Sequence, residues 1–267
     1  MDRTRRLRLV LVGWGAIAQR VVGLLADRST DVDLVGVVAR SQPEGLPPGA
    51  AWLQAPEALP DAAPDLVVEA AGRAAVVPWG QAALRCAPAF IVSSTSAFCD
   101  DEVLDRLLAT AEAHGSRLIV PPGALAGVDA LAAASALPLD EVIHRIVKPP
   151  AAWRGTPAEA AVDLDRLTGA TVFFSGTARQ AAEAYPANAN VAAITALAGI
   201  GLDRTRVELV ADPAATGNGH RLQARGAFGS LDVTIENRPL ATNPKSSDMA
   251  ALSLVRLVEN QIRPLSL

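Results

Sequence analysis

The sequence predicts an α/β protein in two parts: an N-terminal doubly wound parallel sheet, and a second α+β domain built on a mixed, largely antiparallel sheet. Up to about residue 123, short apolar runs alternate with Ala- and Leu-rich helical segments, a rhythm typical of a parallel sheet with helices on both faces. Beyond residue 140 the expected strands are longer and more polar, and glycine-containing turns join them, as in antiparallel sheets. Half of the 267 residues are hydrophobic, enough for one large core or two modest ones.

The strands of the first sheet are expected where short apolar runs recur along the chain. They lie at residues 9–12, 32–39, 66–70, 89–94 and 117–120, with later helices at 74–86 and 101–114. Residues 42–64, rich in Pro and Ala, are expected to form a loop with at most one short helix. Residues 71–72, 94–96 and 123–124 follow strands and should border one crevice, because ligands of such sheets bind at the carboxyl ends of the strands.

The second sheet is expected from strands at residues 141–148, 171–175, 206–210, 222–228 and 231–236, with Gly229-Ser230 as a turn. Helices are expected at 126–136, 178–184 and 190–198, and a final helix at 246–260 should return to the first domain. We therefore divide the chain into a first domain of residues 1–124 plus 241–267 and a second domain of residues 125–240.

The most informative local pattern joins the first strand to the helix after it. Gly13, Gly15 and Ala18 form a Gly-x-Gly-x-x-Ala fingerprint. The glycines allow a tight turn and close approach of a pyrophosphate, and the alanine lets the helix pack on the strand. The first N–H groups of that helix would face the phosphates. This predicts a Rossmann domain that binds a dinucleotide through Gly13, Gly15, Ala16 and Ile17; a purely structural turn is the simpler alternative.

The second strand leaves the choice between NAD and NADP open. An NAD site usually carries Asp or Glu about 20 residues past the glycines, where it binds the ribose 2′-hydroxyl. Here Arg40 and Ser41 follow the strand instead. Arg40 can bind a 2′-phosphate, stack on the adenine or lie in solvent. The expected cofactor is NAD or NADP, with Arg40 as a candidate contact.

Composition and charge argue against several classes of function. A net charge of −4 gives no electrostatic basis for binding nucleic acid or an anionic membrane. The basic start leads into a strand rather than a signal-peptide core, and the apolar stretch 191–202 is too short to span a bilayer. Cys86 and Cys99 lack metal-ligand spacing and are expected to be thiols, not a disulfide. We expect a soluble cytoplasmic protein without a metal.

The chain has three histidines, the side chains that titrate nearest to neutral pH. His114 precedes Gly115 at an expected helix end, where a cation suits the helix dipole. His144 lies inside an alternating strand and is expected to pack or to face solvent. His220 follows Gly217-Asn218-Gly219, a turn that could present a side chain to a cleft. His220 is therefore the candidate catalytic residue.

Five further segments stand in order along the chain. They are residues 123–130 (Gly-Ala-Leu-Ala-Gly-Val-Asp-Ala), 148–150 (Lys-Pro-Pro), 186–193 (Pro-Ala-Asn-Ala-Asn-Val-Ala-Ala), 218–220 (Asn-Gly-His) and 243–247 (Asn-Pro-Lys-Ser-Ser). As an ordered set covering nearly the whole length, they closely resemble the L-aspartate dehydrogenase family. The first-domain fingerprint is shared with many dehydrogenases and adds little to this resemblance.

The resemblance implies a Rossmann domain and a second α/β domain. It also implies that the protein forms a homodimer through the second domain. It implies oxidation of L-aspartate to iminosuccinate with NAD or NADP; the imine hydrolyses to oxaloacetate and ammonia or feeds quinolinate and NAD biosynthesis. His220 is then the active-site residue, Ala124 contacts the cofactor through its backbone amide, and Asn190 also binds the cofactor. From the residues alone, Asn190 and Asn188 could simply cap a helix. Ser246 stands where the family is expected to have Thr.

The implied chemistry suits the residue types. A histidine can accept the proton that the substrate amine must lose before hydride transfer. A dicarboxylate substrate needs cationic partners. The candidates, among which spacing does not choose, are Lys148, Arg154, Arg225 and Lys245.

Other functions stay open from the sequence. The same architecture serves other NAD(P)-dependent amino-acid dehydrogenases and reductases, among them homoserine dehydrogenase and reductases of lysine biosynthesis. A dihydrodipicolinate-type reductase would need a paired-histidine and lysine stretch that this chain lacks. A dinucleotide-sensing protein without catalysis is the remaining alternative, and His220 beside a glycine-containing turn argues against it.

Overall fold

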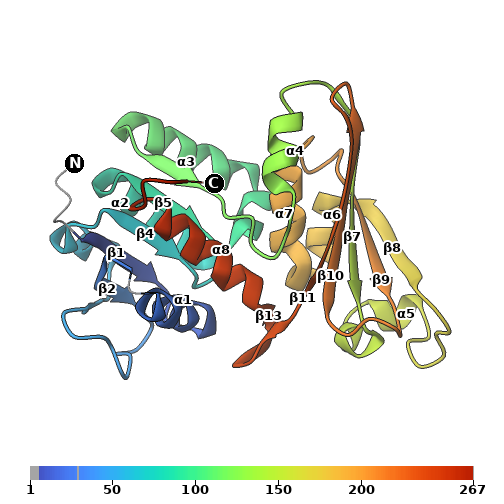
Figure 1. The fold of residues 1–267 in the computed structure, drawn as a ribbon, viewed down its shortest axis with the longest axis horizontal. Coiled ribbons are helices and arrows are strands. Elements are labelled where there is room, and N and C mark those ends of the chain that lie inside the picture. The colour runs from blue at the N-terminus through green and yellow to red at the C-terminus, as the bar shows by residue number, and fades with distance from the viewer. Residues whose placement is uncertain (1–5, 29, 267) are drawn as a thin grey trace. The chain divides into compact units, whose positions relative to one another are not determined.

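The computed structural model describes residues 6–28 and 30–266, apart from the side chains of residues 244 and 245. The chain divides into unit 1, Met1–Pro121 with Ala250–Leu267, and unit 2, Pro122–Met249 (Figure 1). The assignment of a cofactor-binding and a dimerising domain to the predicted residue ranges stays a prediction. Within the described residues, no helix is long and apolar enough to cross a lipid bilayer.

Unit 1 is built on a six-stranded parallel sheet in the order β3-β2-β1-β4-β5-β6. Its strands are β1 (Leu7–Val12), β2 (Val32–Val38), β3 (Ala51–Leu53), β4 (Leu66–Glu69), β5 (Ala89–Val92) and β6 (Arg117–Ile119). Its helices are α1 (Ala16–Asp27), α2 (Arg73–Cys86), α3 (Asp101–His114) and most of α8 (Asp248–Glu259), with short 3-10 helices η1 (Pro56–Ala58), η2 (Pro60–Ala62) and η3 (Thr95–Cys99). This strand order confirms the predicted doubly wound sheet.

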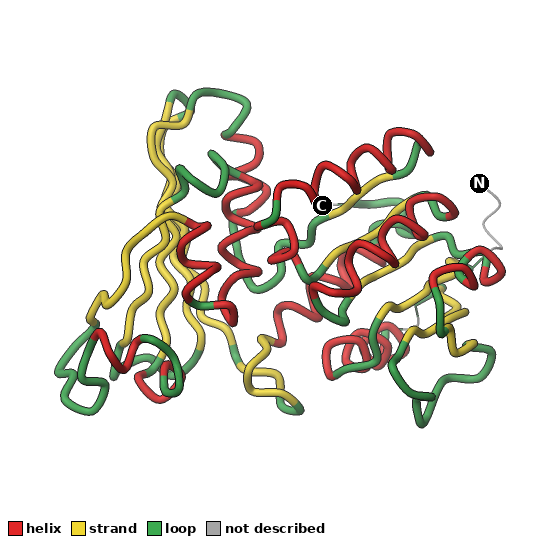
Figure 2. Tube along the Cα trace, turned by 180° about the vertical axis from the view of Figure 1, so that it is seen from behind, coloured by secondary structure: helices red, strands yellow, loops and turns green. Residues whose placement is uncertain are grey.

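Helices cover both faces of the sheet in unit 1 (Figure 2). On one face, Val10 and Phe90 pack with Leu107 of α3 in a fully buried cluster. On the other face, Leu11 packs with Leu254 of α8 and with side chains of α1. Because successive residues of a strand point to opposite sides, the buried parts of β1 and β5 are apolar on both faces. That explains why they appear in the sequence as unbroken hydrophobic runs.

The C-terminal end of α8 is tied to α1 by a buried carboxylate. Glu259 accepts hydrogen bonds from Arg28, at 2.6 Å from Nε and 3.0 Å from Nη2, and from Arg263 Nη2 at 2.8 Å. Arg28 is the residue that ends α1. Its guanidinium holds the pKa of the Glu259 carboxyl below the ordinary value. The two helices on this face of the sheet are thereby joined at their ends.

Unit 2 is built on a five-stranded sheet in the order β11-β10-β7-β9-β8. Its strands are β7 (Leu139–Lys148), β8 (Thr171–Thr177), β9 (Arg206–Ala211), β10 (Asn218–Gly226) and β11 (Gly229–Asn237). Its helices are α4 (Val128–Ala134), α5 (Ala158–Ala161), α6 (Ala178–Ala184) and α7 (Ala189–Ala198), with η4 (Pro150–Trp153), η5 (Pro186–Asn188) and a ribbon of β12 (Pro239–Leu240) and β13 (Asn243–Ser247). β7 and β9 are parallel and the other neighbours antiparallel, which confirms the predicted mixed sheet.

Two glycine-containing segments differ from the sequence prediction. The hairpin between β10 and β11 turns at Ala227-Phe228, because Gly226 pairs with Gly229, so Gly229-Ser230 begins a strand. Asn218 and Gly219 are likewise already part of β10. A Cβ on Gly217 would lie 2.5 Å from the carbonyl oxygen of Asn237. The glycine before β10 therefore allows close approach of two chain segments rather than a flexible turn.

Three strands, β3, β12 and β13, are absent from the sequence prediction, and α8 begins at Asp248 rather than at residue 246 because residues 243–247 form β13. Residues 51–53, inside the expected loop 42–64, form β3 on the free edge of β2. Three residues are too few for a period to be recognised. Leu53 fits there because Gly36 of β2 has no side chain: a Cβ on Gly36 would lie 2.8 Å from Leu53 Cδ1.

Candidate active site

Gly13 and Gly15 have different structural roles after β1. Gly13 has a φ of +110°, and a Cβ there would lie 2.7 Å from the carbonyl oxygen of Ala70. The turn itself therefore requires glycine at this position. Gly15 has an ordinary φ of −83°, and among the described residues no atom lies within 4 Å of where its Cβ would be. The space in front of Gly15 is open, as a pyrophosphate would need.

The first turn of α1 provides amides that can bind an anion. Gly15 is the N-cap and offers no side chain, and the first turn carries no acidic residue. The first backbone bond of the helix runs from Gln19 N to Gly15 O at 3.0 Å. The N–H groups of Ala16, Ile17 and Ala18 thus precede the helical hydrogen-bond ladder. Together with the helix dipole, this cradle fits the pyrophosphate of NAD or NADP.

Glu69 organises the carboxyl edge of the sheet in unit 1. Its side chain is fully buried at the end of β4. Oε1 accepts hydrogen bonds from the backbone N–H groups of Ala71 (2.7 Å) and Gly72 (2.8 Å) and from Ser94 Oγ (2.8 Å), and Oε2 accepts from Ser94 N (2.9 Å). One carboxylate therefore fixes the loops after β4 and β5, two of the three segments expected to border the crevice.

Arg40 is exposed, two residues beyond the end of β2. The backbone beside it is held by the β3 edge strand, because Trp52 Nε1 donates a hydrogen bond to Ala39 O at 3.1 Å. An exposed guanidinium after β2 agrees in position with a contact to the adenosine half of a dinucleotide.

Ala124 belongs to unit 2, where a buried side chain holds its backbone. Asn237 Nδ2 donates a hydrogen bond to Ala124 O at 2.8 Å. Gly123, with a φ of +61°, makes the turn into this segment, and a Cβ there would lie 3.2 Å from Ile194 Cδ1. The position of this backbone segment is therefore fixed by Asn237, and its N–H is the group predicted to contact the cofactor.

The helix-covered face of the sheet in unit 2 brings two histidines into contact. Leu222 of β10 pairs with His144 of β7, and His220 pairs with Ile146. Residues opposite each other, or two apart on one strand, share a face of the sheet, so both imidazoles lie on the same side. His144 Nε2 lies 3.2 Å from His220 Nδ1, and Thr195 Oγ1 of α7 lies 3.0 Å from His144 Nδ1.

Both imidazoles are buried: His144 is 0% exposed and His220 is 6% exposed. Loss of hydration disfavours their charged forms. Burial lowers the pKa of His144 from 6.5 to about 3. Burial also lowers the pKa of His220 well below 6.5, and electrostatic interactions with His144 and Lys148 add to this effect. Both rings are neutral at neutral pH, so His220 is available there as a proton acceptor.

Lys148 ends β7 on the same face as the histidines. Its Nζ donates a hydrogen bond to Asn188 Oδ1 at 2.6 Å and lies 5.1 Å from the ring centre of Trp153. Burial lowers the pKa of this amine to about 8. Asn188 makes no side-chain cap for α7, so it positions the lysine instead. A half-buried ammonium with a neutral amide partner can attract a carboxylate.

The other candidate cations have different surroundings. Arg154 forms an exposed ion pair with Asp165. Arg225 forms one with Glu141, at 2.9 Å. Lys245 lies in β13, and its side chain is outside the description. Among the three cations whose side chains are described, Lys148 is the one that lies near the histidine pair.

The remaining sequence candidates occupy simpler positions. Asn190 is exposed in the first turn of α7. His114 ends α3, where its Nδ1 lies 3.0 Å from Thr110 O and Gly115 forms the left-handed C-cap. The structure therefore agrees with a capping position for His114.

Glu69 was not among the predicted site residues, and His144 was not predicted to contact His220. A charged residue closing an otherwise apolar strand was the available signal for Glu69. His144 was expected to be packing or surface, but its alternation with Val142 and Ile146 in β7 placed it on the buried face. That its neighbour would be His220 depended on the pairing of β7 with β10, which no local pattern reveals.

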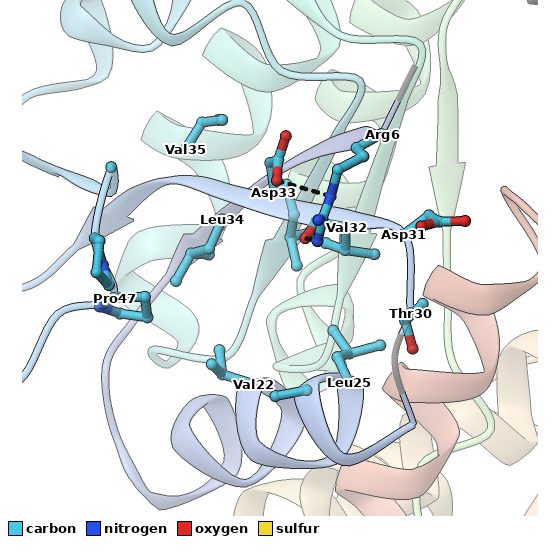
Figure 3. Close-up of a pocket in the computed structure, with 14 residues that line it drawn as sticks. Arg6, Val22, Leu25, Thr30, Asp31, Val32, Asp33, Leu34, Val35 and Pro47 are labelled. Atoms are coloured by element: carbon cyan, nitrogen blue, oxygen red, sulfur yellow. Dashed lines mark hydrogen bonds and ion pairs between the residues drawn. The ribbon is translucent and has the colours of Figure 1, made fainter. Parts of the chain in front are cut away.

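A cavity of about 830 Å³ lies elsewhere in unit 1 (Figure 3). Its walls include Val22 and Leu25 of α1 and Leu34 of β2, and Arg6 pairs with Asp33 across its rim at 2.9 Å. It lies beside the end of β2 where the strand begins, opposite the carboxyl edge that carries Gly13 and Glu69. None of the predicted site residues is among its described lining residues.

Comparison with known families divides the chain at similar places. Residues 129–261 match the family described as "Aspartate dehydrogenase, C-terminal". Residues 13–121 match the family described as "Homoserine dehydrogenase, NAD binding domain". The second match supports NAD or NADP as the cofactor of the parallel-sheet unit.

Individual relatives extend over nearly the whole chain. The chain is 56% identical to an L-aspartate dehydrogenase of Brucella anthropi, over 95% of this chain and 96% of that one. It is 44% identical to an L-aspartate dehydrogenase of Cupriavidus necator, over 98% and 100% of the two chains. Its fold is similar to that of the solved aspartate dehydrogenase from Thermotoga maritima, with a TM-score of 0.77, 26% identity, and coverage of 98% and 100%.

Proposed function

The chain belongs to the L-aspartate dehydrogenase family, and on this premise we propose that it oxidises L-aspartate to iminosuccinate with NAD or NADP. The imine then hydrolyses to oxaloacetate and ammonia, or supplies quinolinate and NAD biosynthesis. The observation that carries the proposal is the buried His144–His220 pair with Lys148 on the same sheet face. A proton acceptor and a carboxylate-binding cation are what this substrate requires beside a hydride acceptor.

His220 is the proton acceptor. Hydride can leave Cα of the substrate only when the amino nitrogen has a free lone pair with which to form the C=N bond. The ammonium form of aspartate must therefore lose a proton, and a neutral imidazole can take it. Because burial keeps the pKa of His220 below its ordinary value, the ring is unprotonated when substrate arrives. Once it has passed this proton to solvent, the neutral ring can take a proton from the water that attacks the imine.

Each unit carries residues that we assign to the cofactor. In unit 1, the turn from Gly13 to Ile17 binds the pyrophosphate. The space beside Gly15 admits the phosphates, and the first amides of α1 donate hydrogen bonds to them. In unit 2, the assigned groups are the N–H of Ala124 and the side chain of Asn190. When bound, the nicotinamide accepts the hydride, and the protein supplies orientation and electrostatics.

Lys148 binds a carboxylate of the substrate. Asn188 and the Trp153 ring hold its ammonium in place without neutralising it. Its charge also disfavours protonation of His220 before substrate binds. A substrate carboxylate that pairs with Lys148 therefore also makes His220 a better proton acceptor, because it offsets a nearby positive charge.

Lys148→Met should raise KM for L-aspartate by about ten- to hundredfold, the value of one charge-assisted contact, with little change in cofactor affinity. Since the ammonium is charged below its pKa of about 8, wild-type kcat/KM should fall as pH rises through that value. This alkaline limb should be lost in the variant. Arg225→Met is the matched control, because that cation is paired with Glu141 and its loss should leave KM unchanged. An unchanged KM in Lys148→Met would contradict the assignment.

Arg40→Ala should weaken binding of NADP by about tenfold or more while affecting NAD far less, if Arg40 meets the 2′-phosphate through a charge-assisted contact. Calorimetric titration with each cofactor measures the difference. Equal losses would indicate stacking on the adenine instead, and no loss with either cofactor would leave Arg40 without a binding role.

A direct assay tests the proposed reaction. Nicotinamide reduction is followed by absorbance with NAD and with NADP, across L-aspartate, L-asparagine, L-glutamate, L-alanine and L-homoserine. L-Aspartate should give by far the highest kcat/KM, and L-asparagine, which lacks the second carboxylate, should give little. Faster turnover of L-homoserine, or reduction with none of the five, would refute the proposal.

The homodimer and the cytoplasmic location belong to the same proposal. The face of the sheet in unit 2 away from the histidines carries a ladder of ion pairs, including Arg145–Glu208 and Arg221–Asp232, which a second copy can cover. Cys86 and Cys99 are half-buried and form no disulfide, as suits a reducing compartment. A monomeric mass in sedimentation equilibrium, or recovery of the enzyme outside the cytoplasmic fraction, would contradict these points.

A further inference from the structure

We propose that Thr195 and His144 are positioning residues that fix the tautomer of His220, so that its Nε2 carries the free lone pair. The inference rests on the proposed function for its chemical meaning, because it explains how His220 is held ready as a base. It rests on a hydrogen-bond chain in which each direction follows from the one before.

The chain begins at a backbone carbonyl of α7. Thr195 Oγ1 lies 3.1 Å from Val191 O, and a carbonyl oxygen can only accept. The single hydroxyl hydrogen of Thr195 therefore points to Val191, as is common for threonine in helices. Oγ1 is then left as an acceptor toward its other neighbour, His144 Nδ1, at 3.0 Å. His144 must carry its hydrogen on Nδ1.

The hydrogen on His144 Nδ1 in turn determines where His220 carries its hydrogen. A neutral imidazole has one N–H, so His144 with a hydrogen on Nδ1 has a lone pair on Nε2. That nitrogen lies 3.2 Å from His220 Nδ1, which must then be the donor. His220 consequently carries its hydrogen on Nδ1, and Nε2 is the basic nitrogen.

The opposite direction is disfavoured at both ends of the chain. If Thr195 donated to His144, its oxygen and that of Val191 would face each other at 3.1 Å with no hydrogen between them. If His144 were protonated, both of its nitrogens would be donors and His220 Nδ1 would have to accept. Complete burial opposes that state, since it lowers the pKa of His144 to about 3.

A neutral partner suits the proposed step better than a carboxylate would. When His220 Nε2 takes a proton from the substrate ammonium, one N–H bond breaks and one forms, and Nδ1 keeps its hydrogen. The resulting imidazolium donates a charge-assisted bond to His144 Nε2. A carboxylate in that place would raise the pKa of His220. The ring would then already carry a proton from solvent before substrate binds. His144 orients the ring while leaving it neutral.

The test uses full-length enzyme labelled with ¹⁵N-histidine, whose three histidines give a simple spectrum. In the wild type, the His220 Nε2 signal should be that of an unprotonated nitrogen and the Nδ1 signal that of an N–H. Thr195→Val, which keeps the shape and removes the hydroxyl, should mix the two tautomers and lower kcat about ten- to hundredfold, with KM for L-aspartate nearly unchanged. Thr195→Ser should restore both the spectrum and kcat.

A matched control separates this role from simple helix packing. Thr110 of α3 makes the same hydroxyl bond to the carbonyl four residues before it, Thr110 Oγ1 to Arg106 O at 2.8 Å. Thr110→Val should leave both the His220 signals and kcat unchanged. A loss of kcat in Thr195→Val without a change of tautomer would overturn the inference, as would a hydrogen on His220 Nε2 in the wild type, a reading that needs no variant to fold. If the tautomer is as inferred but the wild type does not oxidise L-aspartate, the proposed function fails and the inference stands.

Discussion

His220→Ala is expected to lower kcat for L-aspartate oxidation by about 10²–10⁴-fold, the usual effect of removing a general acid–base group. Cofactor affinity should stay near that of the wild type, because the predicted pyrophosphate cradle lies in the other unit. His220 is buried in β10 rather than exposed on a turn. The alanine variant therefore also leaves a cavity, and a modest loss of stability is expected.

His220→Asn separates the chemical role from the structural one. The asparagine amide nitrogen can take the place of Nδ1 and still donate to His144, but it offers nothing in the place of Nε2. We expect this variant to unfold at nearly the wild-type temperature and to be as slow as His220→Ala. Near-native kcat in a folded His220→Asn enzyme would remove His220 as the proton acceptor, and Lys148, whose pKa of about 8 also permits a neutral form, would be examined next.

Gly15→Val is expected to abolish binding of NAD and NADP in a protein that still folds. The backbone at Gly15 is in an ordinary extended conformation, and no described atom would contact its Cβ, so valine fits the protein. The same side chain would fill the space that the pyrophosphate needs. Calorimetry with each cofactor and thermal unfolding of the free protein measure the two effects.

Gly13→Ala provides the contrast to Gly15→Val. A Cβ at Gly13 would lie within 3 Å of the Ala70 backbone, and the residue has a positive φ. This variant should lose stability rather than cofactor affinity alone. Unchanged calorimetric affinity in a folded Gly15→Val protein would mean that the fingerprint is only a structural turn.

The Rossmann part of the fold was predictable because its signals are local. Most strands are apolar runs followed by a helix, and the turn at Gly13 and Gly15 follows from residue type and spacing. α3 and α6 match the predicted ranges 101–114 and 178–184, and in the structure the side chains of Asp100 and Thr177 cap their first turns. β3 was not predicted, because it forms only where β2 has a free edge and where Gly36 leaves space for Leu53. Both are tertiary features.

The candidate site was predictable in part. His220 was proposed from its context and stays a prediction, and the expected flexible turn before it proved to be the start of a strand. His144, Thr195 and Glu69 were not identified, since each acquires its partners from distant segments. His144 meets residues 51 and 76 positions away, and Glu69 meets Ser94 across a helix and a strand. Such contacts require the strand pairing, which a single sequence does not contain.

The most direct test of the account is the pH dependence of nicotinamide reduction in a single turnover, compared between the wild type and His220→Asn. A base must be unprotonated to act, so the wild-type rate should fall as pH drops through the pKa of His220. Because burial lowers that pKa, this fall should lie on the acid side of 6.5. The His220→Asn enzyme should reduce the nicotinamide slowly, and its rate should not show this fall at acid pH. An acid limb of the same position in His220→Asn, at a near-native rate, would show that another group accepts the proton.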